Sequence, residues 1–180
     1  MRRNILAFIL FTLLIKVAVA VVNFPFESDE LTEAEIGDFS AIEFGDHSTA
    51  HDDGPDCKAY PGSEGWPLED EWARLNSSLG GILLKPVPAA AACYEGPYED
   101  QAQCNFLLRN ASRSRFYIDD PLTVLTAWPE GDTCFATASA DELSCTQGGF
   151  PVYVVNATTV KHIQIAVNFA RNKNLRLVIK

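Results

Sequence analysis

Apolar residues recur at helical spacing in the middle of the chain. After Pro67, four of them follow at intervals of four, three and four residues, which places them on one face of a helix. Pro67 suits the first helical position, and Gly80 with Gly81 suits the end of a helix. A second helix is predicted from Tyr98 to Asn110. The residues that form the face of the first helix are Leu68, Trp72, Leu75 and Leu79.

The C-terminal part of the chain combines strand-like and helix-like patterns. Residues 152–155 and 175–179 are short runs rich in apolar and β-branched side chains, and both are predicted to be strands. The helix predicted between them has its N-cap at Thr158 or Thr159 and closes at residues 172–174. Strand, helix and strand in this order predict a βαβ unit with parallel strands and a right-handed crossover. The apolar residues expected to share one helix face are Val160, Ile163, Val167 and Ala170.

We expect this βαβ unit to be the beginning of a larger domain. Two parallel strands and one helix leave a sheet face and a sheet edge uncovered, which finished domains avoid. In open α/β sheets the ligand lies on the loops that follow the strands, and the sequence has no residues after Lys180. The pattern therefore predicts a truncated ligand site.

Residues 1–20 have the three parts of a secretory signal peptide. Two arginines precede an apolar run from Ile5 to Ile15, and residues 18–20 have the small-x-small pattern of a cleavage site. A membrane anchor is the alternative, but Lys16 would place a charge inside the bilayer. We therefore expect cleavage after Ala20, secretion, and no membrane association afterwards.

Acidic residues crowd the segment that follows the predicted signal peptide. No lysine or arginine occurs between Val17 and Cys57. Isolated apolar residues such as Phe39 and Ile42 are not expected to form a core among so many like charges. Residues 21–56 are therefore predicted to be a disordered acidic leader.

The chain as a whole is acidic, with a formal net charge of −10. Such a charge argues against nucleic acid as a partner, because the phosphate backbone repels it. His47 and His51 stand among aspartates, which invites a metal-site interpretation. A solvated loop is the preferred interpretation, so no metal site is predicted.

The five cysteines lack the CxxC spacing of zinc sites. In an oxidising compartment, Cys93 with Cys104 and Cys134 with Cys145 are the expected disulfides, because each pair closes a short loop. Cys57 is left over. It is a reactive thiol, a bridge to another chain, or half of a disulfide whose partner this chain lacks, and we favour the last.

Glycosylation is expected at three sequons, whose asparagines are Asn76, Asn110 and Asn156. Nucleotide, zinc-protease, serine-hydrolase and EF-hand motifs are absent from the sequence. Glu69, Asp70 and Glu71 are adjacent on a predicted helix and point to different sides, so they cannot act as an acid–base pair. His162 is expected to be a surface histidine. The patterns therefore indicate no catalytic residue.

A series of short segments occurs in order between Cys57 and Lys180. The earlier segments are Cys57–Gly62, Trp66-Pro67, Trp72, Leu75-Asn76, Gly81–Pro86 and Cys93-Tyr94; the later segments are Cys134, Cys145, Gly148–Asn156, Phe169–Arg171 and Leu175–Lys180. Together they resemble fungal secreted FAD-linked oxidases, the relatives of vanillyl-alcohol oxidase and berberine-bridge-type enzymes that are also called isoamyl-alcohol-oxidase-like. The first part is similar to the N-terminal cap of these enzymes, and the last part is similar to the opening βαβ unit of a PCMH-type FAD-binding domain.

The resemblance implies an α+β fold, with a disulfide-stapled cap over residues 57–148 and an incomplete FAD-binding domain over residues 149–180. In the family, a glycine and histidine loop follows the strand that ends at Lys180, cradles the pyrophosphate and attaches the flavin. Only Lys180 therefore transfers, as a neighbour of the cofactor, and no catalytic residue does.

The full-length family uses covalently bound FAD to accept hydride from an alcohol-like small molecule and passes the electrons to oxygen. This chain lacks the flavin-attachment loop and the substrate domain, so the resemblance implies an inactive fragment that does not retain FAD. The alternative is a small secreted interaction protein, without enzyme activity, that keeps the cap.

Overall fold

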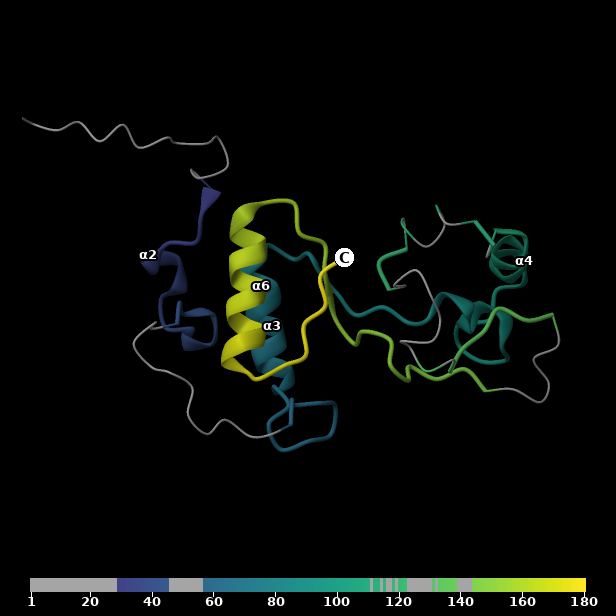
Figure 1. Cartoon of the computed structure of the whole chain (residues 1–180), viewed down its shortest axis with the longest axis horizontal. Helices are drawn as coiled ribbons and strands as arrows, with labels where there is room; N and C mark the ends of the chain where they lie inside the picture. The colour runs from purple at the N-terminus through teal and green to yellow at the C-terminus, as the bar shows by residue number, and fades with distance from the viewer. Residues whose placement is uncertain are drawn as a thin grey trace, which may run out of the picture.

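The computed structural model describes residues 29–45, 57–110, 112–113, 115, 118, 120–122, 131, 133–138 and 144–180. These residues form two lobes joined by extended segments (Figure 1). The predicted signal peptide and both ends of the predicted leader lie outside the described residues. The elements in chain order are α2 (Glu33–Ile36), η2 (Ser40–Ile42), α3 (Glu69–Ser78), β1 (Leu83–Leu84), η3 (Ala89–Cys93), α4 (Gln101–Asn110), β2 (Val154–Val155) and α6 (Val160–Asn172).

Helix α3 confirms the helix predicted after Pro67, although it begins at Glu69. Leu68 is the N-cap, with extended backbone, and its N–H donates to the Glu71 carboxylate at 3.1 Å. Of the four residues of the predicted face, Trp72, Leu75 and Leu79 are buried, whereas Leu68 is 68% exposed. Leu68 precedes the first helical turn, so its side chain does not lie on the face that Trp72, Leu75 and Leu79 share.

Helix α6 packs against α3 in the first lobe, which also contains α2 and η2 (Figure 1). The Thr159 hydroxyl accepts a hydrogen bond from the His162 N–H at 3.2 Å, which confirms one of the two predicted caps. Ile165 and Phe169 face the core. Two residues of the predicted apolar face, Ile163 and Val167, instead lie on the exposed side.

The prediction of a disordered leader is wrong for residues 29–45. Ile36, Phe39 and Ile42 are buried in the core of the first lobe, and Ile42 is completely inaccessible. The acidic side chains between them stay at the surface. Basic residues from later in the chain offset part of their charge, as the ion pairs Arg74–Asp38 and Lys161–Glu35 show. Like-charge repulsion therefore did not prevent burial of the apolar residues.

The sheet of the described residues differs from the predicted one. β2 pairs in antiparallel orientation with β1, with Leu83 opposite Val155 and Leu84 opposite Val154. Residues 176–180 belong to none of the described strands, and Leu175 forms an isolated parallel bridge with Ala59. The described residues therefore do not form the predicted βαβ unit with two parallel strands: the first run pairs with β1 of the cap, and only Leu175 of the second run forms a bridge.

Both predicted disulfides are present in the second lobe, whose described residues include η3, α4, residues 133–138 and residues 144–150. Cys93 bonds to Cys104 and so joins η3 to α4, and Cys134 bonds to Cys145. α4 begins at Gln101, three residues after the predicted start, because the Asp100 carboxylate caps it by accepting from the Gln103 N–H at 2.9 Å. The small apolar cluster of this lobe consists of Ala90, Tyr94, Leu122, Cys134 and Phe150.

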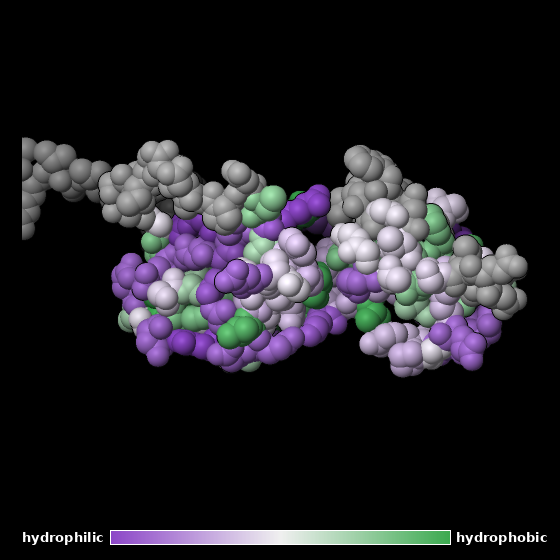
Figure 2. Space-filling model, turned by 90° about the horizontal axis from the view of Figure 1, so that it is seen from below, coloured by the Kyte–Doolittle hydropathy of each residue, from purple (hydrophilic) through white to green (hydrophobic). Residues whose placement is uncertain are grey.

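On the face that Figure 2 displays, the coloured surface is mostly polar, with scattered apolar residues. Within the described ranges, no helix is long and apolar enough to cross a bilayer. The fold thus places one core between α2, α3 and α6, and a second, smaller one beneath the two disulfides.

Candidate functional site

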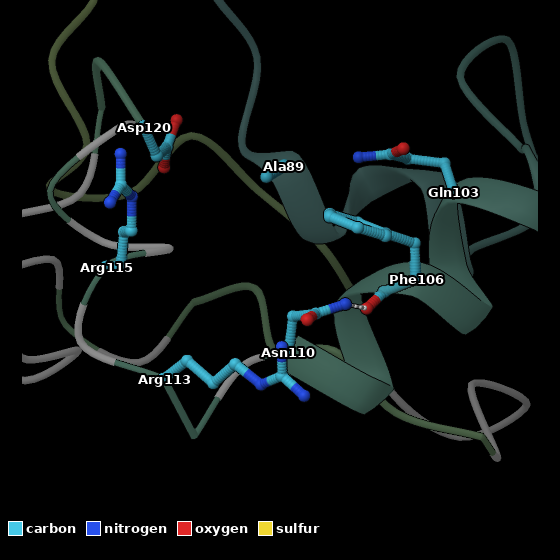
Figure 3. Close-up of a pocket in the computed structure, with 7 residues that line it drawn as sticks. All are labelled: Ala89, Gln103, Phe106, Asn110, Arg113, Arg115 and Asp120. Carbon is cyan, nitrogen blue, oxygen red and sulfur yellow. Dashed lines mark hydrogen bonds between the residues drawn. The ribbon is translucent and has the colours of Figure 1, made fainter.

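A cavity of about 440 Å³ lies in the second lobe between α4 and the segment that follows it (Figure 3). Its volume is within the range of small-molecule sites, about 300–1,000 Å³. Arg115 and Asp120 lie together on one side, and α4 forms the opposite wall. The residues that line the cavity are Ala89, Gln103, Phe106, Asn110, Arg113, Arg115 and Asp120.

Helix α4 presents Gln103, Phe106 and Asn110 to the cavity because they lie three and four residues apart, on one helix face. On another face of α4, Cys104 and Leu107 are buried. The disulfide at Cys104 holds the helix against η3, which carries Ala89 on the cavity wall. The Asn110 amide N–H donates to the Phe106 carbonyl at 2.7 Å, so its side chain is held along the helix (Figure 3).

The polar lining of the cavity combines two guanidinium groups, two amides and the Asp120 carboxylate. Arg113 and Arg115 bring two guanidinium groups, which match the geometry of carboxylates and phosphates. Gln103 and Asn110 add amide groups. None of the described lining residues is a serine, cysteine or histidine that could act as a nucleophile.

Lys180, the predicted neighbour of a cofactor, lies close to this cavity. Its ammonium group donates a hydrogen bond to the backbone carbonyl of Asp120, which lines the cavity. The C-terminal segment thus runs from the first lobe, where it leaves α6, toward the second (Figure 1). The structure therefore brings Lys180 together with a cavity that the sequence patterns did not indicate.

The described helix N-termini do not fit the pyrophosphate of FAD. A pyrophosphate at such a position needs unpaired backbone N–H groups and a positive end of the helix dipole. Thr159 caps α6 and Asp100 caps α4, so these N-termini already have intramolecular partners. The first turn of α3 carries three acidic residues, which repel phosphate. None of these described N-termini therefore offers a ready position for the pyrophosphate.

The three glycosylation sequons lie on separate segments and form no common site. Asn156 is exposed between β2 and α6. Asn76 is half-buried near the end of α3, where its side-chain oxygen accepts from the Leu83 N–H at 3.1 Å. Asn110 lies on the cavity wall. Glycosylation at these positions stays a prediction.

The three adjacent acids at the start of α3 have separate partners. Glu69 contacts Lys85 at 3.2 Å and the Tyr153 hydroxyl at 3.4 Å. Glu71 pairs with Lys173 of the chain segment that follows α6. Burial raises the pKa of Glu71, but the hydrogen bonds from Lys173 and from the Leu68 N–H outweigh it, so the pKa is lowered overall. These contacts connect segments of the first lobe and leave no acid–base pair.

The remaining candidate residues have local contacts. The His162 ring accepts a hydrogen bond from the Thr158 N–H at 3.3 Å, which supports the start of α6. Cys57 is exposed and belongs to neither disulfide. Among the described residues, no group of three or more potential ligands could hold a metal ion. His47 and His51 lie outside these residues.

The cavity arginines had one signal in the sequence. Arg109, Arg113 and Arg115 fall within seven residues, and no acidic residue lies between Asp100 and Asp119. In a chain of net charge −10 such a basic segment indicates an anion-facing surface. The sequence pattern does not reveal that residues of α4 and η3 line the same cavity as Arg113 and Arg115.

Comparison with curated proteins identifies relatives among fungal flavoproteins. The chain is 40% identical to the FAD-linked oxidoreductase apf9 of Gibberella fujikuroi over 124 residues, which are 69% of this chain and 21% of that protein. It is 33% identical to the VAO-type flavoprotein oxidase VAO615 of Thermothelomyces thermophilus over 136 residues, which are 74% of this chain and 24% of that protein. No protein-family model matches the chain.

Solved structures give the same relationship. The structure of the VAO-type flavoprotein MtVAO615 from Myceliophthora thermophila matches 69% of this chain with a TM-score of 0.63 and 33% identity, and the match is 23% of that protein. MtVAO713 from the same organism matches with a TM-score of 0.61. This chain thus spans only about a fifth to a quarter of the length of these relatives. Over 69% of its length, the chain therefore belongs to the fungal FAD-linked oxidoreductases of the VAO type.

Proposed function

We propose that this chain acts as the N-terminal part of a secreted FAD-linked oxidoreductase and does not hold FAD when it is alone. The observation that carries the proposal is the match itself, which extends over 69–74% of this chain but only 21–24% of its relatives. The capped or acidic N-termini of the described helices support it, because none of these offers a ready position for a pyrophosphate.

In the complete enzyme, FAD would accept a hydride from an alcohol-like small molecule and be reoxidised by oxygen. The contribution of this chain would be to hold the segment after α6 in place. Ala59 donates its N–H to the Asn174 carbonyl at 2.9 Å, and Lys180 contacts Asp120. The two disulfides hold η3, α4 and the loop around Cys134 together beside this segment.

We further propose that the chain enters the secretory pathway, loses residues 1–20, and carries glycans on its sequons. The sequence pattern of residues 1–20 and the three sequons support this proposal. The two disulfides also support it, because such bonds persist in oxidising compartments. N-terminal sequencing of the protein from the medium of a fungal host tests the cleavage, and a secreted chain that still begins at Met1 would contradict it.

Flavin content tests the central proposal. The 180-residue chain is expressed in a fungal host beside full-length VAO615 as the positive control, and both are purified from the medium. We expect flavin absorbance from the control, and neither flavin absorbance nor hydrogen-peroxide release with a panel of alcohols from this chain. Flavin bound near one per chain would show that these residues build a complete cofactor site, and the proposal would be wrong.

A further inference from the structure

One face of α6 binds the main chain of residues 29–45 through a row of polar side chains. The Gln164 side-chain oxygen accepts from the Leu31 N–H at 2.7 Å, near the start of this segment. The buried Asn168 amide donates to the Ile42 carbonyl at 3.0 Å. Both contacts reach backbone groups, so they fix the path of the segment along the helix. The row consists of side chains three or four positions apart, which share a helix face: Lys161, Gln164, Asn168, Arg171 and Asn172.

The end of the segment is held by two adjacent residues of α6. The Asn172 amide donates to the Ala41 carbonyl at 3.1 Å and to the Glu43 carbonyl at 3.0 Å. The Arg171 guanidinium also donates to Glu43, and it lies against Gly45, where an added Cβ would be 2.8 Å from its Nη1 atom. A side chain at position 45 would therefore push the guanidinium away, so glycine suits this contact.

Apolar side chains of the segment enter the core of the first lobe, and its acidic side chains lie at the rim. Ile36, Phe39 and Ile42 recur every third residue and are 4%, 7% and 0% exposed. Arg74 and Lys161 pair with acidic residues around them. Buried apolar anchors inside a polar rim are the arrangement of a binding interface.

Charge also matches between the segment and the helix. Residues 29–45 contain six acidic residues and no basic one, whereas α6 contains two basic residues and no acidic one. Opposite charges on two facing surfaces favour their association and select against partners of the wrong sign. This face of α6 therefore suits an acidic peptide.

The segment and the chain after it have separate attachments. Residues 46–56 lie outside the described residues, and all the contacts above are made by residues 29–45 themselves. On the far side of that gap, the Asn174 amide donates to the Cys57 carbonyl at 3.0 Å, and the Ala59 N–H donates to the Asn174 carbonyl at 2.9 Å. The contacts that hold the segment on α6 thus do not depend on its covalent connection to Cys57.

We propose that the face formed by α3 and α6 is a binding site for an acidic peptide, and that residues 29–45 are a separable ligand that occupies it. The ligand is defined by apolar anchors three residues apart, acidic residues around them and a glycine at its end. It stays bound when the connection to Cys57 is cut, and the same peptide added from solution replaces it.

Cleavage of the folded chain tests the proposal. A site for a sequence-specific protease, flanked by flexible spacers, is inserted within residues 46–56, and the purified protein is cut until its intact mass shows complete cleavage. We expect the N-terminal fragment to co-elute with the rest of the chain in size-exclusion chromatography. An excess of synthetic peptide 29–45 should displace it, with a dissociation constant between about 1 and 100 μM.

Peptide variants test the assigned anchors without changing the protein. Ile42→Asp in the labelled peptide should weaken its binding at least about 100-fold, because the carboxylate would enter a dry core. The matched control is Phe44→Asp, which places the same charge two residues later on a side chain that is 45% exposed. Its affinity should stay within about threefold of the unmodified peptide. Fluorescence anisotropy with the cut protein measures both.

A protein variant tests the polar row. Asn172→Asp exchanges an amide donor for a carboxylate that faces two carbonyls, so it should weaken binding of the unmodified peptide at least about tenfold. Ile163→Asp is the control, because it introduces the same charge on α6 at a residue that is 52% exposed. It should bind the peptide as the unmodified protein does.

Three results would overturn the proposal. The fragment could leave the cut protein while the peptide fails to bind at about 1 mM, which corresponds to negligible affinity. The cut protein could unfold, or keep a fragment that excess peptide does not displace, and residues 29–45 would then be a fixed part of the fold instead of a ligand. Equal affinities of the Ile42→Asp and unmodified peptides would show that the peptide binds elsewhere.

Discussion

Single side chains connect the acidic segment of the chain to residues more than a hundred positions later. The Lys161 ammonium contacts the Glu35 carboxylate at 2.8 Å and that of Asp29 at 3.5 Å. The hydrogen bond from Lys161, followed by those from the hydroxyl and the N–H of Thr32, lowers the pKa of Glu35 to about 2. The Glu35 hydrogen bond in turn raises the pKa of Lys161. This contact stabilises the charged forms of both groups in the folded chain.

The first prediction concerns acid stability. Because the pKa of Glu35 is lower in the folded chain than the ordinary value of 4.5, its contribution is complete above pH 4.5 and is lost as the pH falls toward 2. We expect Glu35→Gln to lower the urea midpoint at pH 6 and to weaken its dependence on pH between 4.5 and 2. Urea titrations at several pH values measure both effects.

The control for this prediction is Glu33→Gln on the same helix. Glu33 is exposed, and no ion pair involves its carboxylate among the described residues. The Glu33→Gln variant should show the same dependence of stability on pH as the unmodified chain. If Glu35→Gln loses stability with acid as steeply as the unmodified chain does, the assigned role of the Lys161 contact is incorrect.

At the scale of elements, the polar residues of α6 explain how η2 can dock against it. The Asn168 amide donates to the Ile42 carbonyl at 3.0 Å, and the Asn172 amide donates to the Ala41 carbonyl at 3.1 Å. The Arg171 guanidinium donates to the Glu43 carbonyl at 2.6 Å. The carbonyls at the end of η2 therefore have partners, and its apolar side chains can be buried without leaving polar groups unpaired.

The second prediction tests this docking. Ile42→Ala should lower the free energy of unfolding by about 2–5 kcal/mol, because it removes a fully buried side chain and leaves a cavity. Phe44→Ala is the matched control, since Phe44 follows η2 but is 45% exposed. Its effect should be much smaller. Urea unfolding followed by tryptophan fluorescence measures both, because Trp72 lies in the same core.

A mobile acidic segment would give the opposite result. In that case Ile42→Ala and Phe44→Ala would change the unfolding free energy equally little, and residues 29–45 would contribute nothing to the core. The correction of the predicted leader depends on this difference between the two variants.

At the scale of the whole molecule, the two lobes are stabilised by different means. The first lobe buries a continuous core of large side chains, in which the Phe169 ring contacts the rings of both Phe39 and Trp72. The second lobe has only a small apolar cluster and contains both disulfides. A small core needs cross-links that reduce the entropy of the unfolded chain, each contributing about 3 kcal/mol for a loop of this length.

The third prediction follows from this division. Reduction of the disulfides with dithiothreitol should increase amide exchange in residues 89–110 and 133–150 while α3 and α6 keep their protection. Hydrogen–deuterium exchange with mass spectrometry compares the oxidised and reduced chain. An equal loss of protection in α3 and α6 would show that the two lobes unfold together and that the disulfides stabilise both.

Short-range sequence patterns were enough to predict several features of this protein. The stripe of Trp72, Leu75 and Leu79 predicted α3, and the threonines before Val160 predicted the start of α6. The spacing of the cysteines predicted both disulfides, and the order of short segments after Cys57 indicated the oxidase family. These features depend on residues within a few turns of one another or on a local likeness, so the sequence alone contains them.

Tertiary structure decided which apolar surfaces are buried and which segments contact one another. The sequence shows two apolar sides on α6, and only the position of Phe39, Trp72 and Phe169 in space selects the buried one. The acidic segment folds because basic and amide groups of a helix more than a hundred residues away bind it. The pairing of β2 with β1 and the cavity beside Arg113 likewise depend on segments that are distant in the chain. Local periodicity cannot encode such contacts, since their free energy exists only after the chain has brought these segments together.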